Sequence, residues 1–251
     1  MEQERTRDNM KIISIIPSRY QSSRFPGKPL ALIYGKPMIQ WVYEKVNSVE
    51  SIAETYVATD DERIYSAVCA FGGKAIMTGE CNCGTDRVYQ ACKDIDADIV
   101  LNIQGDEPMI KQEMILQLIS AFDDDSVNMA TLKKQIFTEA DINNPNIAKI
   151  LTDENNNAIY FSRSTIPYNR DGAEVKYYKH VGVYGYKKDF LKTFVSLPQA
   201  SLEKAEQLEQ LRAIQNGYKI RVVETQYESI GVDLPEHIAR VEEEMKKSGI
   251  V

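Results

Sequence analysis

The sequence lacks the features that mark membrane, nucleic-acid-binding and repeat proteins. None of its segments approaches the run of about 18 apolar residues that a transmembrane helix needs, so we expect no membrane insertion. The net charge is −7 and no long block of consecutive Lys and Arg occurs, which argues against nucleic-acid binding. Internal repeats and linkers rich in Pro, Gly and Ser are also absent. We therefore expect a soluble globular protein.

Cysteine and histidine are too few to suggest a metal centre of their own. The chain has four cysteines and two histidines. Cys81 and Cys83 form a Cys-x-Cys pair, but no second pair has the spacing of a zinc site. The polar residues 1–10 do not resemble a secretory signal, and we expect them to be frayed. Together these features predict reduced thiols and a cytoplasmic protein.

Strand and helix signals alternate through the first half of the chain. Short apolar segments rich in Ile and Val predict strands at 11–16, 54–59, 74–78 and 98–103. Segments with a period near 3.6 predict helices at 37–48, 61–71, 85–95 and 111–121. This alternation is typical of an α/β fold, a Rossmann-like open and mostly parallel sheet flanked by helices.

The second half is less regular. We expect strands at 127–135, 148–152, 158–162, 178–186 and 219–224, and helices at 201–216 and 235–247. No composition shift marks a domain boundary, so residues 1–251 are interpreted as one domain in which about 135–200 forms a smaller lobe.

A loop of small and basic residues follows the first strand. It begins with Pro17 and Ser18, contains Arg19 and Arg24, and ends at Lys28. Ligands of open α/β sheets bind at the carboxyl ends of the strands. Small residues let backbone N–H groups approach phosphate oxygens, and the basic side chains neutralise charge. This loop predicts a site for a triphosphate or another polyanion.

Two acidic residues further along the chain are candidate metal ligands. Asp106 follows the strand at 98–103, next to Gly105, and Mg²⁺ prefers one or two carboxylates together with phosphate oxygens. Asp233 precedes the last expected helix, where an Asp taken alone is more typical of a helix cap, with Pro235 in the first turn. The two carboxylates could also form a joint metal site.

Several motifs, spread in order over residues 11–247, resemble the 3-deoxy-manno-octulosonate (Kdo) cytidylyltransferase family. They are Ile16-Pro17-Ser18-Arg19, Arg24-Phe25-Pro26-Gly27-Lys28, Ala58-Thr59-Asp60, Gly84-Thr85-Asp86-Arg87, Gln104-Gly105-Asp106-Glu107-Pro108, Tyr160-Phe161-Ser162-Arg163, His180 to Tyr186, Leu208 to Arg212 and Gly231-Val232-Asp233. The resemblance implies transfer of CMP from CTP to the anomeric hydroxyl of Kdo, with release of pyrophosphate. It also implies Mg²⁺ as cofactor, a homodimer and a product for lipopolysaccharide or capsule biosynthesis.

The resemblance also implies roles for individual residues. Arg19, Lys28, Asp106 and Asp233 match the catalytic positions, with Asp106 and Asp233 as the metal ligands. The nucleotide-binding positions are Pro17, Ser18, Arg19, Lys28, Cys83, Gly84, Arg87 and Asp106. The sugar acid carries a carboxylate, so a positive group is expected in the smaller lobe. The positions for the sugar acid are Gln104, Arg163, His180, Tyr184, Glu209 and Gln210.

One stretch departs from the family pattern. The family usually has a His and a Ser before Gly-Thr-Asp-Arg, whereas this chain has Cys81 and Cys83 there. A thiol is a weaker hydrogen-bonding group than a hydroxyl, so contacts with the nucleotide at this point are expected to differ.

Other functions remain open from the residues alone. A cytidylyltransferase for 8-amino-Kdo or another 2-keto-3-deoxy sugar acid, including a sialate-type enzyme, would carry a similar loop. A nucleotide-binding regulator without turnover is a further alternative, although it predicts loss of a metal carboxylate and both Asp106 and Asp233 are present.

Overall fold

The computed structural model describes residues 10–22 and 24–251, and the chain divides into two units. Unit 1 comprises residues up to Leu116 together with Glu228–Val251, and unit 2 comprises Gln117–Tyr227. Residues 1–9, for which we expect fraying, lie outside the described residues. Unit 2 is wider than the lobe expected at about 135–200, because it includes the strands on either side of that range.

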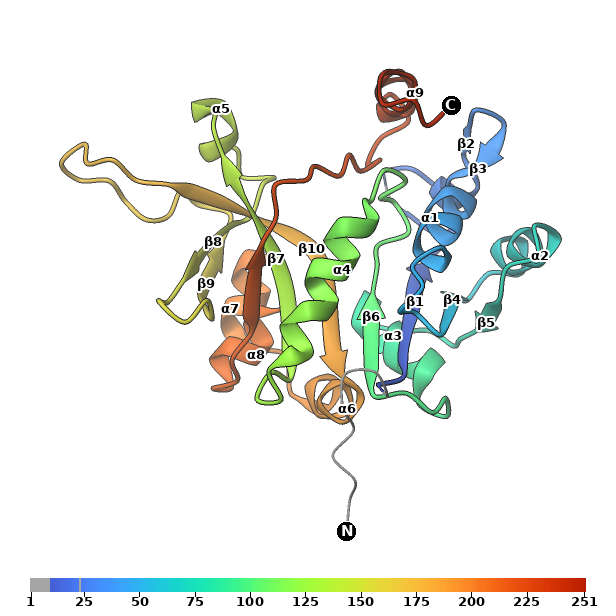
Figure 1. The fold of residues 1–251 in the computed structure, drawn as a ribbon, viewed down its shortest axis with the longest axis horizontal. Helices are drawn as coiled ribbons and strands as arrows, with labels where there is room; N and C mark the ends of the chain where they lie inside the picture. Colours follow the sequence, from blue (N-terminus) through green and yellow to red (C-terminus); the bar gives the residue numbers. More distant parts are fainter. Residues whose placement is uncertain (1–9, 23) are drawn as a thin grey trace, which may run out of the picture. The chain divides into compact units, whose positions relative to one another are not determined.

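Unit 1 is built on a parallel sheet with the order β6-β1-β4-β5 (Figure 1). The strands are β1 (Ile12–Ser18), β4 (Glu54–Thr59), β5 (Ala75–Met77) and β6 (Ile99–Asn102). Every residue of β1 except Pro17 is buried, as expected of a central strand covered on both faces. The helices α1 (Met38–Asn47) and α3 (Gly84–Cys92) both pack on β1 and β4.

Unit 1 contains further short elements and two more helices. They are η2 (Lys28–Leu30), the small hairpin of β2 (Leu32–Ile33) and β3 (Lys36–Pro37), α2 (Glu62–Ala70) and α9 (His237–Lys247). The last helix returns from the far end of the chain and packs against β2. Its buried residues Val241 and Met245 share an apolar cluster with Ile33 and Met38. Helix α4 (Gln112–Ser120) leads out of unit 1.

Unit 2 has a mixed sheet. Its strands are β7 (Met129–Ile136), β8 (Lys149–Thr152), β9 (Ala158–Ser162), β10 (Tyr177–Lys187) and β11 (Arg221–Glu224). β7 pairs with β11 in parallel and with β10 antiparallel, and β8 pairs antiparallel with β9 and β10. The helical segments are η3 (Ala121–Asp123), α5 (Glu139–Ile142), α6 (Lys188–Ser196), α7 (Ser201–Glu206) and α8 (Leu211–Gln215).

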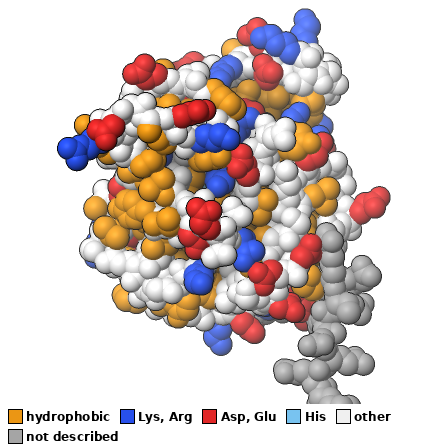
Figure 2. Space-filling model, turned by 60° about the vertical axis from the view of Figure 1, so that its left-hand side comes forward, with side chains coloured by type: hydrophobic (Ala, Val, Ile, Leu, Met, Phe, Trp, Pro, Cys, Tyr) orange, Lys and Arg blue, Asp and Glu red, His pale blue; other side chains and the backbone are white. Residues whose placement is uncertain are grey.

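Large apolar side chains are exposed on unit 2. Tyr168 is 86% exposed and Phe137 is 79% exposed, and Ile159 on β9 also lies at the surface. Figure 2 brings forward the side of the molecule that carries β8 and β9, and hydrophobic side chains gather on that face. Lone exposed apolar residues are ordinary, but a gathering of them marks a surface suited to contact with another apolar surface.

The predicted α/β class, with an open and mostly parallel sheet, is confirmed. The antiparallel pairs β7–β10, β8–β9 and β8–β10 lie in unit 2, and the small antiparallel hairpin of β2 and β3 lies in unit 1. Each strand predicted in the first half is present, with ends shifted by a few residues. The sequence did not indicate α6, and the last helix begins at His237 rather than at Pro235.

The single helix predicted at 201–216 is wrong. The structure has α7 and α8 instead, separated at Gln207, whose φ of 52° is left-handed. The carbonyl of Glu206, which a continuing helix would use for an internal bond, instead accepts a hydrogen bond from Arg163 Nε at 2.8 Å. A contact with a residue 43 positions away therefore ends the helix, despite its regular apolar spacing.

None of the helices in the described part of the chain combines the length and apolarity needed to cross a bilayer.

Candidate active site

The loop after β1 is folded back on itself. The N–H of Gly27 donates a hydrogen bond to the carbonyl of Tyr20 at 2.8 Å, which closes the loop. Gly27 has a φ of 73°, and a Cβ at this position would lie 3.1 Å from the Tyr20 ring. Both observations require glycine here. On the ring of Tyr20 rests the guanidinium group of Arg63, 3.2 Å from the centroid. The loop is thus preorganised before any ligand binds.

The closed loop places its basic residues beside the two predicted metal ligands. Lys28 Nζ lies 2.5 Å from Oδ2 of Asp106 and 4.0 Å from Oδ1 of Asp233. Arg24 Nη2 lies 2.9 Å from Oδ1 of Asp233. Arg19 follows the end of β1 directly and its side chain is exposed. The expected convergence of cations and carboxylates from distant parts of the sequence is present in unit 1.

The two acidic loops are held together by the backbone. The N–H of Val232 donates to the carbonyl of Asp106 at 2.9 Å, so each carboxylate-bearing loop fixes the other. Val232 and Met109 are buried in the apolar cluster beneath helix α9, which anchors both loops close to their Asp residues. This packing explains how residues 127 positions apart in the chain are positioned without a disulfide or a short connection.

The helix-cap interpretation of Asp233 is wrong. The N-cap of α9 is Glu236, and no side chain caps this helix. Instead, the backbone N–H of Asp233 donates to Nδ1 of His237 at 3.2 Å, while its carboxylate is engaged by Arg24. The Asp233 side chain is therefore committed to the charged cluster rather than to the helix.

Close packing behind the cluster leaves a polar group without a partner. A Cβ on Gly105 would lie 2.7 Å from Ser18 Oγ and 3.3 Å from the carbonyl of Pro17, so only glycine fits at this position. The Ser18 hydroxyl is buried and has no hydrogen-bond partner among the described residues. Buried polar groups are normally paired, so an unpaired hydroxyl beside Gly105 leaves a bond that a bound ligand would supply.

The amino end of α3 carries the stretch in which this chain departs from the family pattern. Cys83 is the N-cap of α3, and its Sγ accepts a hydrogen bond from the N–H of Asp86 at 3.4 Å. The thiol thus performs the capping role that a Ser hydroxyl would have. Gly84 is the first residue of the helix and has open space around its Cα. A helix amino terminus with an uncluttered first residue suits an anionic ligand.

Arg87 lies inside this part of unit 1. The residue is 1% exposed, and its guanidinium group bonds to the carboxylate of Asp60 and the hydroxyl of Thr78. Asp60 and Thr78 follow β4 and β5 respectively, so Arg87 ties α3 to the carboxyl ends of two strands. In the described structure, Arg87 therefore stabilises the helix and the strand ends at which the nucleotide is predicted to bind.

The predicted sugar-acid residues fall in both units. Gln104 lies in unit 1, where its amide donates to Oδ1 of Asn102 at 3.3 Å. The other five lie in unit 2: Arg163 after β9, His180 and Tyr184 on β10, and Glu209 and Gln210 in the connection between α7 and α8.

The rings of His180 and Tyr184 lie against each other on β10. Their centroids are 5.3 Å apart, and the ring of Phe161 meets His180 edge-on at 5.1 Å. Burial lowers the pKa of His180 to about 3, so this imidazole is neutral at neutral pH. Burial, with the nearby Tyr186 and Glu209, raises the pKa of Tyr184. The positive group expected in this part of the chain is therefore Arg163 and not His180.

Arg163 is bonded to the connection that carries Glu209 and Gln210. Its Nε and Nη1 donate to the carbonyls of Glu206 and Pro145, at 2.8 and 3.2 Å. The carboxylate of Glu206 accepts in return from the N–H of Arg163 at 2.9 Å. In the same connection, the Gln210 side chain is buried and its Nε2 has no partner among the described residues. These contacts hold Arg163 against the start of the connection that carries Glu209 and Gln210.

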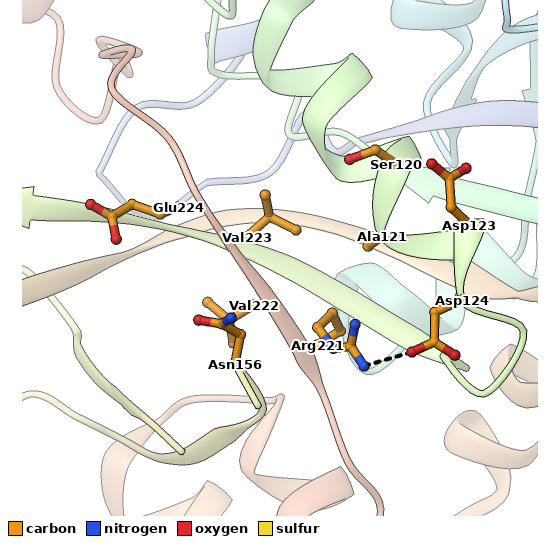
Figure 3. Close-up of a pocket in the computed structure, with 9 residues that line it drawn as sticks. All are labelled: Ser120, Ala121, Asp123, Asp124, Asn156, Arg221, Val222, Val223 and Glu224. Atoms are coloured by element: carbon orange, nitrogen blue, oxygen red, sulfur yellow. Dashed lines mark hydrogen bonds and ion pairs between the residues drawn. The ribbon is translucent and has the colours of Figure 1, made fainter. Parts of the chain in front are cut away.

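A pocket at the β11 edge of unit 2 was not predicted from the sequence. This cavity of about 480 Å³ is lined from η3, β11 and the turn at Asn156, and Figure 3 shows Arg221 reaching toward Asp124. Their ion pair is 2.9 Å long, and hydrogen bonds from Ser126 together with Arg221 lower the pKa of Asp124 to about 2. Asp123 and Glu224 add further negative charge, which makes the pocket unsuited to a triphosphate or a sugar acid.

Comparisons with known proteins agree with the resemblance found in the sequence. The profile of the cytidylyltransferase family matches residues 13–220. A 3-deoxy-manno-octulosonate cytidylyltransferase of Syntrophus aciditrophicus (strain SB) is 52% identical over 237 residues, which cover 92% of this chain and 96% of that protein. One from Geotalea uraniireducens (strain Rf4) is 49% identical, covering 95% of this chain and 100% of that protein.

Solved structures extend the comparison to the fold. A CMP:2-keto-3-deoxy-manno-octonic acid synthetase complexed with CTP superposes with a TM-score of 0.91 at 44% identity, over 95% of this chain and 99% of the other. A 4-diphosphocytidyl-2C-methyl-D-erythritol synthase from Anaerococcus prevotii shares the fold alone, with a TM-score of 0.62 at 16% identity, over 94% of this chain and 96% of the other. The chain therefore belongs to the cytidylyltransferase family, among the 3-deoxy-manno-octulosonate cytidylyltransferases.

Proposed function

We propose that this protein transfers CMP from CTP to the anomeric hydroxyl of 3-deoxy-D-manno-octulosonate and releases pyrophosphate. The observation that carries the proposal is the charged cluster of unit 1, in which Lys28 and Arg24 meet Asp106 and Asp233. Such an arrangement suits a triphosphate, whose charge needs both cationic side chains and a divalent cation. The names of the relatives supply the nucleotide and the sugar acid.

The basic residues would act on the leaving group. Arg19, Arg24 and Lys28 all lie on the loop that Gly27 closes, so they would neutralise the β- and γ-phosphates from a preorganised position. Charge builds up on pyrophosphate as its bond to the α-phosphorus breaks, so these cations would stabilise the transition state more than bound CTP. Positioning and charge neutralisation are sufficient for such a transfer, and no covalent nucleophile is required.

The donor set fits magnesium. Asp106 and Asp233 are carboxylates held within one charged cluster, and no group of three or more metal-binding side chains occurs among residues 10–22 and 24–251. Mg²⁺ prefers one or two carboxylates and completes its shell with phosphate oxygens and water, so two Asp residues suit it better than they suit zinc or calcium. When bound, the ion would polarise phosphate oxygens and the attacking hydroxyl.

The residues of unit 2 would recognise the sugar acid. Arg163 supplies the positive charge for its carboxylate, and His180, Tyr184, Glu209 and Gln210 offer neutral and acidic groups for its hydroxyls. Gln104 in unit 1 is proposed to contribute a further hydrogen bond. The unpartnered Nε2 of buried Gln210 supports this assignment, because an isolated buried amide is costly unless a ligand satisfies it.

A matrix of substrates tests the proposed function. Pyrophosphate release is measured with each of the four nucleoside triphosphates against Kdo, 8-amino-Kdo and sialic acid, with and without added Mg²⁺. We expect release with CTP and Kdo, and none after chelation of the metal. Preference for 8-amino-Kdo or sialic acid would reassign the sugar. Tight CTP binding without turnover of any sugar acid would instead favour a nucleotide-binding regulator.

The assembly and location of the protein are proposed on separate grounds. We propose a cytoplasmic homodimer in which exposed apolar side chains of unit 2, among them Phe137, Ile159 and Tyr168, contact the second copy, because large apolar groups at a surface suit contact with another apolar surface. Light scattering coupled to size-exclusion chromatography would then give twice the mass of the chain, and Phe137→Asp would give a monomer.

A further inference from the structure

Thr131 on β7 makes more hydrogen bonds than one hydroxyl can donate. Its Oγ1 lies 2.8 Å from the carbonyl of Val183, 3.1 Å from the carbonyl of Val181 and 3.0 Å from Nε2 of His180. The cause is a bulge in β10. Val181 pairs with Leu132 and Tyr184 pairs with Thr131, so the two residues between Val181 and Tyr184 have no opposite residue on β7. The fully buried Thr131 side chain lies against this bulge.

The single proton of Thr131 fixes the direction of each bond. Carbonyl oxygens only accept hydrogen bonds, so the hydroxyl proton must go to Val183 or Val181. If the proton went to His180 instead, the hydroxyl oxygen would face two carbonyl oxygens at 2.8 and 3.1 Å with no proton between them. The hydroxyl lone pair is therefore directed to His180, and Nε2 of His180 must be the donor.

The tautomer of His180 follows from this bond. Desolvation lowers the pKa of His180 to about 3, so the imidazole is neutral at neutral pH and carries one proton, and that proton is on Nε2. Nδ1 then has a free lone pair. Among the described residues no protein group bonds to Nδ1, and His180 is only partly buried by its neighbours. An acceptor nitrogen in such a position pairs with a hydroxyl, not with a carboxylate.

We propose that Thr131 is a positioning residue that holds His180 in the Nε2–H tautomer, so that Nδ1 accepts a hydrogen bond from a hydroxyl group of the sugar acid. The tautomer stands on the protein alone, whereas its role in substrate recognition rests on the proposed function. The ring of Tyr184 packs against the same ring at a tilt of 44° and restricts its rotation, so the acceptor is fixed in direction as well as in protonation.

NMR of the free protein tests the tautomer directly. The chain contains only two histidines, His180 and His237, so a long-range ¹⁵N–¹H spectrum of ¹⁵N-histidine-labelled protein is assigned with one variant, His237→Gln. At pH 7 we expect a protonated Nε2 and an unprotonated Nδ1 for His180. An Nδ1–H tautomer, or a doubly protonated ring, would overturn the inference whatever the activity of the protein.

Two substitutions at position 131 test the consequence. Thr131→Val keeps the shape but removes the hydroxyl, and we expect the Nε2–H tautomer to lose its dominance and the KM for Kdo to rise about tenfold, with the KM for CTP within about twofold. Thr131→Ser keeps the hydroxyl and should restore both. A purely structural role would lower the melting temperature of both variants without changing the tautomer.

The outcomes separate the inference from the proposed function. If His180 is the Nε2–H tautomer but no sugar acid releases pyrophosphate, the proposed function fails and the tautomer assignment stands. If Kdo is a substrate and Thr131→Val leaves both the tautomer and the KM for Kdo unchanged, the positioning role is wrong. If Thr131→Val does not fold, Thr131→Ala takes its place as the variant without a hydroxyl, and the wild-type spectrum still decides the tautomer.

Discussion

Lys28 Nζ lies 2.5 Å from Asp106 Oδ2 and only 4.0 Å from Asp233 Oδ1, with a side chain that is just 15% exposed. One ammonium group therefore offsets the repulsion between two carboxylates that come from distant loops. In the proposed reaction the same cation would face phosphate oxygens. The Lys28–Asp106 pair is thus the centre of the proposed nucleotide site.

Asp106→Asn keeps the shape of this side chain and removes its charge. We expect pyrophosphate release to fall by at least about 100-fold, because one of two proposed carboxylate ligands of the metal is lost, while CTP binding weakens only moderately because the basic loop remains. Release is followed with a coupled pyrophosphate assay and CTP binding by calorimetry.

The matched control is Asp96→Asn. Asp96 is also an Asp in an ion pair with a lysine of unit 1, but its side chain is 78% exposed and it lies in no predicted site. We expect wild-type activity from this variant. Near-normal turnover of Asp106→Asn would remove Asp106 from the metal site.

The parts of the fold that were predicted correctly depend on local patterns. β4 is a short apolar strand and α2 is capped by Asp61, and both were found close to their expected bounds. The break at Gln207 could not be predicted, because it depends on the hydrogen bond from Arg163 to a carbonyl far away in the chain. Apolar spacing continues through the break and gives no sign of it.

In the candidate site, too, the residues marked by a local pattern could be predicted and those positioned by long-range contacts could not. The loop ending at Lys28 and the Asp106 motif were found from residue types at strand ends, whereas Asp233 taken alone suggested a helix cap. Its placement beside Lys28 results from the Val232–Asp106 backbone bond and from the packing of α9, which no local pattern encodes. Thr131 could not be identified, because its contacts depend on the register of β7 against the bulge in β10.

Substitutions of Arg163 test whether its positive charge or its hydrogen bonds to backbone carbonyls matter for binding of the sugar acid. We expect Arg163→Ala to raise the KM for the sugar acid at least about tenfold, with a much smaller effect on the KM for CTP, because the lost guanidinium both carries the positive charge and holds the carbonyl of Glu206. Steady-state kinetics with each substrate varied in turn gives both values.

Arg163→Lys distinguishes the two roles. Lysine restores the charge but not the planar fork that reaches the carbonyls of Glu206 and Pro145. Recovery of the sugar-acid KM would assign Arg163 to the carboxylate of the substrate, and no recovery would assign it to positioning the connection that carries Gln210. Equal effects on both substrates in Arg163→Ala would exclude it from the sugar site.

Cys83→Ser is expected to stabilise the protein. Cys83 caps α3 through a thiol, which is a weak acceptor, and Ser is among the preferred N-cap residues. We expect the free energy of unfolding to rise by about 0.5–1 kcal/mol in urea titrations. Cys69→Ser, on the surface of α2, is the control for loss of a thiol and should have little effect. A loss of stability confined to Cys83→Ser would mean that the packing of the thiol outweighs its weakness as a cap.

The neutral state of His180 makes stability depend on pH. Burial lowers its pKa from 6.5 to about 3, so between these values the unfolded chain binds a proton that the folded protein does not. Folding is therefore unaffected by this group above about pH 6.5 and is progressively disfavoured as the pH falls toward 3. The slope from one such group is at most about 1.4 kcal/mol per pH unit.

The contribution of His180 is isolated by comparison with His180→Gln, which cannot titrate. We expect the wild type to lose about 1–2 kcal/mol more stability than the variant between pH 7 and pH 5, measured by urea unfolding at each pH. Glu209 and the tyrosines near the ring are common to both proteins, so their contributions cancel in the difference. Parallel pH profiles for the two proteins would mean that His180 is protonated as readily in the folded protein as in the unfolded chain, and its assignment as a neutral acceptor would then fail.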